Sequence, residues 1–531
     1  MAKFKPFLLV ILDGFGISLE KLGNPVFEAK KPNLDKIEQN FPFTTLQASG
    51  VAVGLPWGEA GNSEVGHLTM GAGRVLYHHL PRIIYSIYDG SFFKNEALMK
   101  AVERVRANKS RFHIAGLVSS GSAHSYIDHL YALLEFTKKE NLPEVYLHIF
   151  TDGKDAPPQE AAKFLTMLEE RMRKEWPHAH LASVTGRNYA MDRDEKWERI
   201  RVAYELFTQG NGQKTASVPD YLYKSYEKGL SDEAIEPAIV VDAAGNSIGL
   251  IKENDALFFF NFREDSMREI TRAFSDDVFD YFPRQKITNL FIVTMTEYQK
   301  DLNNVFTAFP PLDTTWPFAR VLGEAGLRHL HIAETQKYAH VTYFFNGGKE
   351  KPFLGEERIL VPSSAAANFD EAPEMKSREI AAKILENFDK YDVIIANFAN
   401  TDMVGHSGNF NAAIKAVEAV DECVGQLVDA VLNSGAAMLI TGDHGNIELK
   451  RNIISGEKLT EHSINPVPLY LVGNAFKRKT LRSEEEINKQ KSETNGILTD
   501  IVPTAIELLG LNKPQEMTGE SLLPKLLNQI Q

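Results

Sequence analysis

Residues 7–14 have the sequence FLLVILDG, an apolar run that ends abruptly in an aspartate and a glycine. Two later stretches have the same form, residues 393–402 (VIIANFANTD) and residues 437–444 (AMLITGDH). Short, continuous apolar runs are typical of strands that are buried on both faces of a parallel sheet. We therefore expect three buried parallel strands, each followed by polar side chains.

Helical patterns accompany these strands, over residues 377–387, 411–432 and 497–509. A strand followed repeatedly by a helix favours a doubly wound α/β sheet. In such sheets ligands gather beyond the carboxyl ends of the strands. The polar residues that follow each apolar run are therefore expected at one functional edge.

The first strand lies hundreds of residues before the other two, which predicts a second domain inserted into the first. A chain of 531 residues is long enough for two or three domains. The middle of the chain has its own α/β rhythm, with strands expected at 112–118, 145–150, 181–184, 256–260 and 290–294 and a helix at 195–207. With hinges near 77–82 and 309–316, the predicted domains are residues 1–79 with 313–531, and residues 80–312.

The composition is that of a folded enzyme, with 43% hydrophobic and 24% charged residues. A net charge of −13 argues against a nucleic-acid or anionic-membrane surface. The single cysteine, Cys423, lies in a helical pattern and is expected to be a buried thiol. Residues 7–12 are too short to span a membrane, so the predicted location is the cytoplasm.

Carboxylates and imidazoles follow the expected strands. Taken singly, Asp402 and His406 could be a helix-capping aspartate and a surface histidine. Three aspartates and three histidines at neighbouring strand ends form too regular a pattern for independent caps: Asp13, Asp402, His406, Asp443, His444 and His462. A mixed oxygen and nitrogen donor set favours a pair of divalent transition ions, and we predict Mn²⁺. Two such ions can activate an alcohol and stabilise a phosphoryl group.

The candidate nucleophile is Ser63, which lies between glycines in residues 61–67 (GNSEVGH) at a possible helix start. It could simply cap that helix. Alternatively, the amides of the helix start face an anion, and an activated serine oxygen there could accept a phosphoryl group. Asn62 could donate to that group, whereas His67 is expected to be structural. The chain contains no Walker loop, and the Gly-x-Ser-x-Gly match at residues 245–249 (GNSIG) does not include Ser63.

Short polar clusters follow the expected strands of the middle region, at residues 122–125, 151–155, 186–193 and 261–263. Any one of their arginines could form only a surface salt bridge. Together, in an acidic chain, they predict a pocket for a small anion with carboxylate and phosphate groups, because arginine binds either group bidentately.

Seven stretches resemble the cofactor-independent phosphoglycerate mutases, in the order in which that family has them: residues 12–16, 62–74, 151–158, 186–197, 334–348, 402–406 and 441–446. The family belongs to the alkaline phosphatase-like superfamily. The resemblance runs almost end to end, and it implies an isomerase with an inserted substrate-binding transferase domain. The implied reaction interconverts 3-phosphoglycerate and 2-phosphoglycerate through a phosphoserine, with the inserted domain closing to retain the glycerate.

The resemblance also implies roles for individual residues. One metal ion would be held by Asp13, Ser63, Asp443 and His444, and the other by Asp402, His406 and His462. Substrate binding is implied for His124, Lys154, Asp155, Arg187, Arg193, Arg263 and Lys337. Lys337 would lie near the transferring phosphoryl group, and Asp155 is the candidate general base for the glycerate hydroxyl.

Several positions depart from the family pattern. Lys154 stands where an arginine is usual, Ser266 replaces a second arginine, and residues 119–123 lack an expected aspartate and glycines. Residues 364–366 (SAA) lack the usual Pro-Lys. The altered residues concern the substrate rather than the metals, and Arg268 is a nearby candidate for compensation.

Two alternatives remain open from the sequence. The altered substrate residues would suit a metal-dependent phosphatase, or a mutase for another small phosphorylated acid. A catalytically silent homologue that binds metal or ligand is a further possibility, although Ser63 and the full metal set argue against it. The chain is expected to act as a monomer, because a mobile inserted domain can close the site without a partner subunit.

Overall fold

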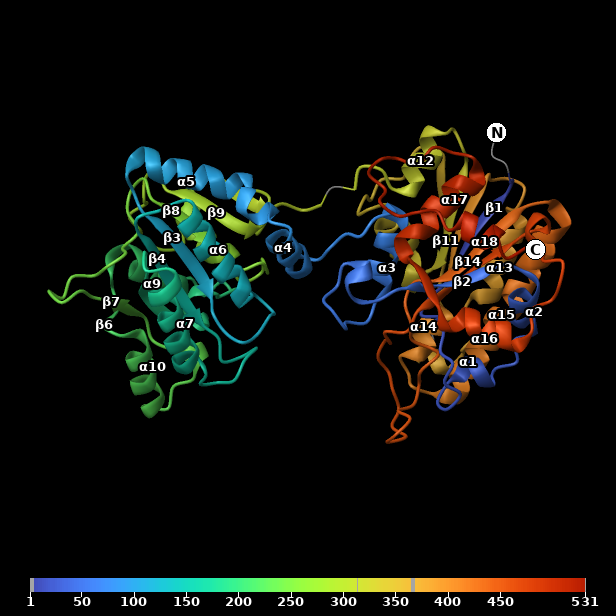
Figure 1. The fold of residues 1–531 in the computed structure, drawn as a ribbon, viewed down its shortest axis with the longest axis horizontal. Coiled ribbons are helices and arrows are strands. Elements are labelled where there is room, and N and C mark those ends of the chain that lie inside the picture. Colours follow the sequence, from blue (N-terminus) through green and yellow to red (C-terminus); the bar gives the residue numbers. More distant parts are fainter. Residues whose placement is uncertain (1–3, 313, 364–367, 531) are drawn as a thin grey trace. The chain divides into compact units, whose positions relative to one another are not determined.

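The computed structural model describes residues 4–312, 314–363 and 368–530. The chain forms two compact units, one from the described residues of Met1–His78 and Leu312–Gln531, the other from His79–Pro311 (Figure 1). Each unit contains an eight-stranded sheet. The first unit is discontinuous in sequence, so its blue N-terminal strand lies among orange C-terminal elements in Figure 1.

The sheet of the first unit has five parallel strands followed by an antiparallel one. In spatial order its strands are β12 (Glu356–Val361), β11 (His329–Glu334), β13 (Val393–Phe398), β1 (Phe7–Leu12), β14 (Ala437–Gly442), β15 (Val467–Val472), β2 (Phe43–Gln47) and β16 (Thr494–Ile497). Strand β15 runs antiparallel to both β14 and β2. The three strands predicted from apolar runs are neighbours, with β1 between β13 and β14.

Strand β1 shows why this sheet is wound on both faces. Leu8, Val10 and Leu12 belong to one apolar core, which also contains residues of helix α15 (Phe410–Ser434). Phe7, Leu9 and Ile11 alternate with them and belong to a second core, shared with helix α17 (Ile501–Leu509). Successive side chains of a strand point to opposite faces, so a wholly apolar strand needs a helical layer on each side. The predicted doubly wound α/β class is confirmed.

The other helices of the first unit are α1 (Pro25–Glu28), α2 (Pro32–Asn40), α3 (Ser63–Ala72), α12 (Phe318–Glu324), α13 (Ser377–Glu386), α14 (Asn400–Gly405), α16 (Glu484–Ser492) and α18 (Leu523–Leu527). A short 3-10 turn, η4 (Thr335–Lys337), follows β11. Cys423 is fully buried in α15, as the sequence predicts.

The second unit also has a mostly parallel sheet, in the order β10 (Val305–Phe309), β9 (Phe291–Thr296), β8 (Ala256–Phe259), β3 (Phe112–Leu117), β4 (Val145–Thr151), β5 (Ala179–Gly186), β7 (Ala238–Val240) and β6 (Gln213–Thr215). Only β7 pairs antiparallel, with β5. Its helices are α4 (His79–Tyr88), α5 (Glu96–Asn108), α6 (Ile127–Lys139), α7 (Ala161–Glu175), α8 (Arg187–Ala190), α9 (Trp197–Gln209), α10 (Val218–Glu227) and α11 (Arg268–Ser275).

The helical pattern over residues 497–509 begins one residue too early. Ile497 ends the edge strand Thr494–Ile497, which pairs parallel with β2. Leu498–Asp500 then form a 3-10 turn, and α17 continues from Ile501. Across the described part of the chain, no helix has the length and apolarity needed to cross a membrane.

Candidate metal centre and anion pocket

The sheet of the first unit brings the predicted metal ligands together. Asp13 follows β1 and Asp443 follows β14, while Asp402 lies in α14, just after β13. Because β1 lies between the other two strands, their carboxyl ends meet at one edge. Ser63 opens helix α3, but it is Asn62 that caps the helix, accepting from the amide of Val65 at 2.9 Å. The hydroxyl of Ser63 is therefore not used as a cap.

A first cluster comprises Asp13, Asp443 and His444, all fully buried, with one potential ligand atom of each within 4.8 Å of the others. Ser63 adjoins it: its hydroxyl donates to Oδ1 of Asp13 at 2.9 Å and lies 3.0 Å from Nε2 of His444. The atom Oδ2 of Asp443 has no hydrogen-bond partner among the described residues. His67 Nδ1 is 3.2 Å from this oxygen, but that nitrogen faces the carbonyl of Ser63 at 2.8 Å.

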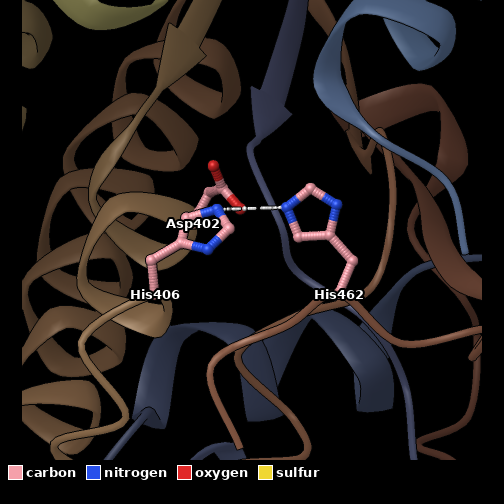
Figure 2. Close-up of side chains that lie close together, drawn as sticks. All are labelled: Asp402, His406 and His462. Atoms are coloured by element: carbon pink, nitrogen blue, oxygen red, sulfur yellow. Dashed lines mark hydrogen bonds and ion pairs between the residues drawn. The ribbon is translucent and has the colours of Figure 1, made fainter. Parts of the chain in front are cut away.

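Figure 2 shows a second cluster, in which the side chains of Asp402, His406 and His462 converge from α14 and from the loop that precedes β15. Oδ1 of Asp402 lies 3.4 Å from Nε2 of His406 and 3.3 Å from Nε2 of His462. The two Nε2 atoms are 3.1 Å apart. This cluster is more open than the first, since His406 is exposed and His462 is partly exposed.

The tautomers of these two histidines show that the second cluster fits a metal ion. Nδ1 of His406 is 3.0 Å from the carbonyl of Thr460, and Nδ1 of His462 is 2.8 Å from the carbonyl of Gly61. A carbonyl only accepts, so each Nδ1 carries a proton, and in the neutral imidazole each Nε2 presents a lone pair. Two lone pairs and a carboxylate oxygen then face one another, an arrangement that a cation stabilises. Metal-binding histidines commonly donate their other N–H to a carbonyl in this way.

Lys337, at the end of η4, lies beside both clusters. Its Nζ is 2.7 Å from Oδ1 of Asp13, 2.6 Å from Oδ2 of Asp402 and 2.6 Å from Oγ of Ser63. Burial alone would lower the pKa of Lys337, but Asp13, Asp402 and Asp443 outweigh it and raise the pKa. The ammonium group therefore stays charged next to the serine oxygen.

The carboxylates of Asp13 and Asp402 remain ionised. Burial would raise the pKa of Asp13 and of Asp402, but Lys337 and the neighbouring histidines together outweigh it and lower both below their usual range. Burial would likewise lower the pKa of His444, yet Asp443 and the other carboxylates raise it to about 9. A buried site that favours positive charge this strongly suits divalent cations.

Two supporting residues were not singled out by sequence reasoning. Asn397 in β13 donates to Oδ2 of Asp13 at 2.6 Å, and its amide lies 3.1 Å from Nε2 of His67. Asn446 donates to Oδ1 of Asp402 at 2.7 Å. The position of Asn446 directly after Asp443-His444-Gly445 was a usable signal, whereas Asn397 is hidden inside an apolar strand.

The predicted anion-binding residues line one cavity of about 150 Å³ in the second unit. It includes His124, Lys154, Asp155, Arg187, Arg193 and Arg263, and also Asp192, Arg199 and Ser266. Arg187 is held from two sides: Nη1 donates to Asp152 at 2.5 Å and to Asp155 at 2.6 Å, and Nη2 lies 2.8 Å from Nε2 of His124.

His124 is a neutral acceptor for Arg187. The guanidinium only donates, so Nε2 of His124 accepts and Nδ1 carries the proton, which faces Oγ of Ser266 at 3.1 Å. Burial, together with Arg187 and Arg263, lowers the pKa of His124 to about 4. Ser266 stands where the family pattern has an arginine. It thus forms a hydrogen bond with His124 and adds no positive charge to the cavity.

Two other arginines of the cavity share an acidic partner. Arg193 and Arg263 both donate to Oδ2 of Asp265, at 2.5 and 2.9 Å. Lys154 is exposed. Arg268 is not among the cavity's lining residues; its Nε donates to the carbonyl of Tyr298 at 3.0 Å, so the structure gives no support to its predicted compensating role.

The predicted site residues therefore form two groups, each described within its own unit. Asp13, Ser63, Lys337, Asp402, His406, Asp443, His444 and His462 gather in the first unit, and the six anion-binding residues gather in the second. The altered residues 364–366 lie outside the described residues. Asp152 and Asp265, which hold the arginines, were not predicted as site residues.

Comparisons with known proteins agree on one family. Residues 5–513 match the family described as the metalloenzyme superfamily. The chain is 47% identical over 524 residues to a 2,3-bisphosphoglycerate-independent phosphoglycerate mutase of Clostridium novyi (strain NT), covering 98% of this chain and 100% of that protein. It is 45% identical to the enzyme of the same name from Clostridioides difficile (strain 630), with 98% and 99% covered.

A solved structure adds a likeness of fold. The crystal structure of Leishmania mexicana phosphoglycerate mutase at low cobalt concentration has a TM-score of 0.51 with this chain, at 31% sequence identity, and the match covers 98% of both chains.

Proposed function

The chain belongs to the metalloenzyme superfamily and, within it, to the 2,3-bisphosphoglycerate-independent phosphoglycerate mutases, and on that premise we propose how it interconverts 3-phosphoglycerate and 2-phosphoglycerate. The proposal is that Ser63 carries the phosphoryl group between the two hydroxyl positions, at a site that holds two Mn²⁺ ions. The reaction is an isomerisation, because the phosphoryl group leaves and returns to the same glycerate.

One observation carries this proposal: the hydroxyl of Ser63 lies where the charged groups of the first unit meet. It donates to Asp13, lies beside His444, and accepts from Lys337 at 2.6 Å. A serine used only for packing or capping has no need of a buried ammonium group. Ser63 is also the first residue of α3, so its oxygen lies near free amides at the positive end of the helix.

The donor set supports two divalent ions. Asp13, Ser63, Asp443 and His444 would hold one, and Asp402, His406 and His462 the other. A mixed set of carboxylate and imidazole ligands favours a transition ion such as Mn²⁺ over Mg²⁺ or Ca²⁺. Bound there, such ions supply Lewis acidity, which lowers the pKa of an alcohol and stabilises negative charge on phosphoryl oxygens.

In the first half of the reaction, Oγ of Ser63 forms a bond to phosphorus while the bond from phosphorus to the glycerate 3-oxygen breaks. The ions held at this site would lower the pKa of the serine hydroxyl, so Ser63 would enter this step already deprotonated, with the ammonium group of Lys337 beside its oxygen. The ammonium group of Lys337 stabilises the charge that develops on the serine oxygen and on the transferring group. Asp155 supplies the proton that the departing 3-oxygen needs.

The second half reverses these steps at the neighbouring hydroxyl. Asp155 takes the proton of the 2-hydroxyl, the 2-oxygen attacks phosphorus, and Ser63 leaves as the deprotonated serine with which the cycle began. Asp155 thus acts first as acid and then as base, so protons balance over the cycle. Between the halves the glycerate must be retained and water excluded, because water would hydrolyse the phosphoserine.

The arginine pocket supports the retention of glycerate. Arg187, Arg193 and Arg263 offer paired donors to a carboxylate or phosphate, and Lys154 adds a charge. His124 remains neutral and therefore does not add a charge of its own. We propose that residues 80–312 are the substrate-binding transferase domain and that residues 1–79 with 313–531 form the metal-binding domain. We also propose that the enzyme acts as a monomer in the cytoplasm, which size-exclusion chromatography and cell fractionation would test.

The test is to supply 3-phosphoglycerate and Mn²⁺ without 2,3-bisphosphoglycerate and to follow 2-phosphoglycerate and free phosphate together. The proposal expects 2-phosphoglycerate as the main product and its loss in Ser63→Ala. Ser377→Ala is the matched control, because Ser377 is also the first residue of a helix in this unit. Free phosphate as the main product would instead indicate a phosphatase, and full turnover by Ser63→Ala would refute the phosphoserine.

A further inference from the structure

Lys450 is a fully buried lysine that has no role in the chemistry described above. It follows the Asp443–Asn446 segment in a stretch that forms no helix or strand. Its ammonium group contacts three oxygens: the carbonyl of Gly405 at 3.2 Å, the carbonyl of Glu461 at 3.4 Å, and Oδ1 of Asn446. These oxygens belong to three different segments of the chain, and all three hydrogens of the ammonium group have a partner.

Each of these three oxygens belongs to a residue that is connected to a ligand of the second metal cluster, either as its neighbour in the chain or by a hydrogen bond. Gly405 directly precedes His406, and Glu461 directly precedes His462. Asn446 provides the third connection, because its Nδ2 donates to Oδ1 of Asp402 at 2.7 Å. Oδ1 of Asp402 is also the oxygen that faces both imidazoles. One cation is therefore linked to all three ligands.

The hydrogen-bond chemistry fixes the direction of the Asn446 link. A lysine ammonium only donates, so the oxygen of the Asn446 amide must face Lys450. The amide nitrogen must then face Asp402, whose ionised carboxylate only accepts. The same Nδ2 also donates to the backbone carbonyl of Asp402 at 3.3 Å, so Lys450 on one side and Asp402 on the other fix the orientation of the amide together.

Lys450 is one of several groups that anchor the backbone near His462, together with the bridge between Gly445 and Ser463. Residues 451–458 form a hairpin-like excursion, closed by a bridge between Arg451 and Lys458, with Ile454 almost fully exposed at 97%. The chain returns from this excursion directly to Glu461 and His462. Lys450, at the start of the excursion, binds the carbonyl of Glu461 near its end. Lys450 thus connects the end of the excursion, at Glu461, to the segment that carries Asp402 and His406.

We propose that Lys450 is a positioning residue that sets the geometry of the Asp402, His406 and His462 cluster, and so the affinity of the metal ion at this cluster alone. The inference rests on the proposed two-metal function. None of the side-chain bonds of Lys450 reaches Asp13, Asp443 or His444. Asp443 is supported by a different contact: its Oδ1 accepts a hydrogen bond from the amide of Gly14 at 2.9 Å.

The test compares Mn²⁺ binding to the metal-free full-length protein with binding to Lys450→Met, by calorimetry and by the electron paramagnetic resonance signal of free Mn²⁺. Methionine keeps an unbranched apolar stem but has no ammonium group. Losing a supporting contact of this kind typically weakens metal binding about 10- to 100-fold. The proposal expects this loss at one of two sites, with the other unchanged. Lys458→Met, an exposed lysine of the same excursion, is the control.

Two further measurements separate positioning from a general loss of structure. The site that Lys450→Met weakens should be the one that His462→Ala weakens, and combining the two substitutions should add little. The Mn²⁺ concentration for half-maximal turnover should rise about 10- to 100-fold in Lys450→Met, while turnover at saturating Mn²⁺ falls much less. If Lys450→Met does not fold, Asn446→Ala removes the link to Asp402, keeps the lysine, and should weaken the same site.

The outcomes are distinct. Unchanged affinity at both sites in Lys450→Met would overturn the positioning role and leave the proposed function intact. Equal weakening of both sites, or a loss that saturating Mn²⁺ does not restore, would also overturn it. If the unmodified protein binds no metal ion at either cluster, the two-metal function itself fails.

Discussion

Nζ of Lys337 lies 2.6 Å from Oγ of Ser63, and the same ammonium group contacts Asp13 and Asp402. These two carboxylates belong to different metal-ligand clusters. Lys337 therefore contacts the nucleophile and an acidic ligand of each cluster. The arrangement places a fixed positive charge where a serine oxygen and a phosphoryl group would share negative charge.

Replacing Lys337 by methionine should lower kcat about 100- to 1000-fold, the usual effect of removing one preorganised donor from a reacting oxygen. KM for 3-phosphoglycerate should change much less, because the arginine pocket is untouched. Steady-state kinetics at saturating Mn²⁺ would measure both constants. Lys351→Met, an exposed lysine of the same unit, is the control. A kcat within about threefold of the unmodified enzyme's would contradict the role of Lys337.

Removing metal with a chelator should abolish turnover, and Mn²⁺ should restore it. Ions that bind only the folded protein also stabilise it by mass action, by about 2.7 kcal/mol at 100 times the dissociation constant. The unfolding temperature should therefore rise with added Mn²⁺, and rise less in His406→Ala, which loses a ligand of the second cluster. His180→Ala, at an exposed position of β5, should behave like the unmodified protein. Full activity after complete metal removal would refute the metal site.

Arg187→Met should reduce kcat/KM for 3-phosphoglycerate about 10- to 100-fold, since a hydrogen bond to a charged group contributes about 1.5–3 kcal/mol. The structure gives a second reason: Arg187 also holds Asp155, the proposed acid and base, at 2.6 Å. Both kcat and KM should therefore change. The control is Arg171→Met on α7, where the arginine pairs with Glu175 and does not line the cavity. Equal values for the two variants would exclude a substrate role for Arg187.

His129, in α6, should make the protein less stable in mild acid. Burial lowers the pKa of this histidine to about 3. As pH falls below about 6.5, the unfolded chain binds a proton at this residue whereas the folded chain does not, so stability is lost until pH approaches the folded-state pKa. Between pH 7 and pH 5 this loss amounts to about 2 kcal/mol.

Unfolding by urea at the two pH values would measure this contribution. His129→Leu should reduce the difference in unfolding free energy between pH 7 and pH 5 by about 2 kcal/mol, because leucine does not titrate. His180→Leu, an exposed histidine in the same unit, should leave the difference nearly unchanged. If both variants show the same pH dependence as the unmodified protein, His129 is not the buried neutral group described here.

The central strands could be predicted from the sequence because their environment is simple. Phe7–Leu12 and Val393–Phe398 are buried on both faces, and the predicted bounds agree with the structure. The edge of the same sheet could not be predicted in this way. Thr494–Ile497 becomes a strand through its pairing with β2, a contact that local periodicity does not record.

The metal ligands could be predicted as a group because they follow strands that proved to be neighbours. His462 is different: it lies in an irregular loop, and its place depends on hydrogen bonds such as that from Lys450 to Glu461. Lys450 and Glu448 escaped prediction because charged residues in a loop are usually exposed. Both are buried, and Glu448 accepts from the amides of Gly16 and Asn446.

The most direct test of the central claim is to find where the phosphoryl group is held. The enzyme would be mixed with 3-phosphoglycerate carrying a ³²P label, quenched in acid within milliseconds, and digested for peptide mapping. The account predicts label on the peptide that contains Ser63, formed fast enough to be an intermediate and absent in Ser63→Ala. Label on another residue, or rapid turnover with no labelled peptide, would contradict it.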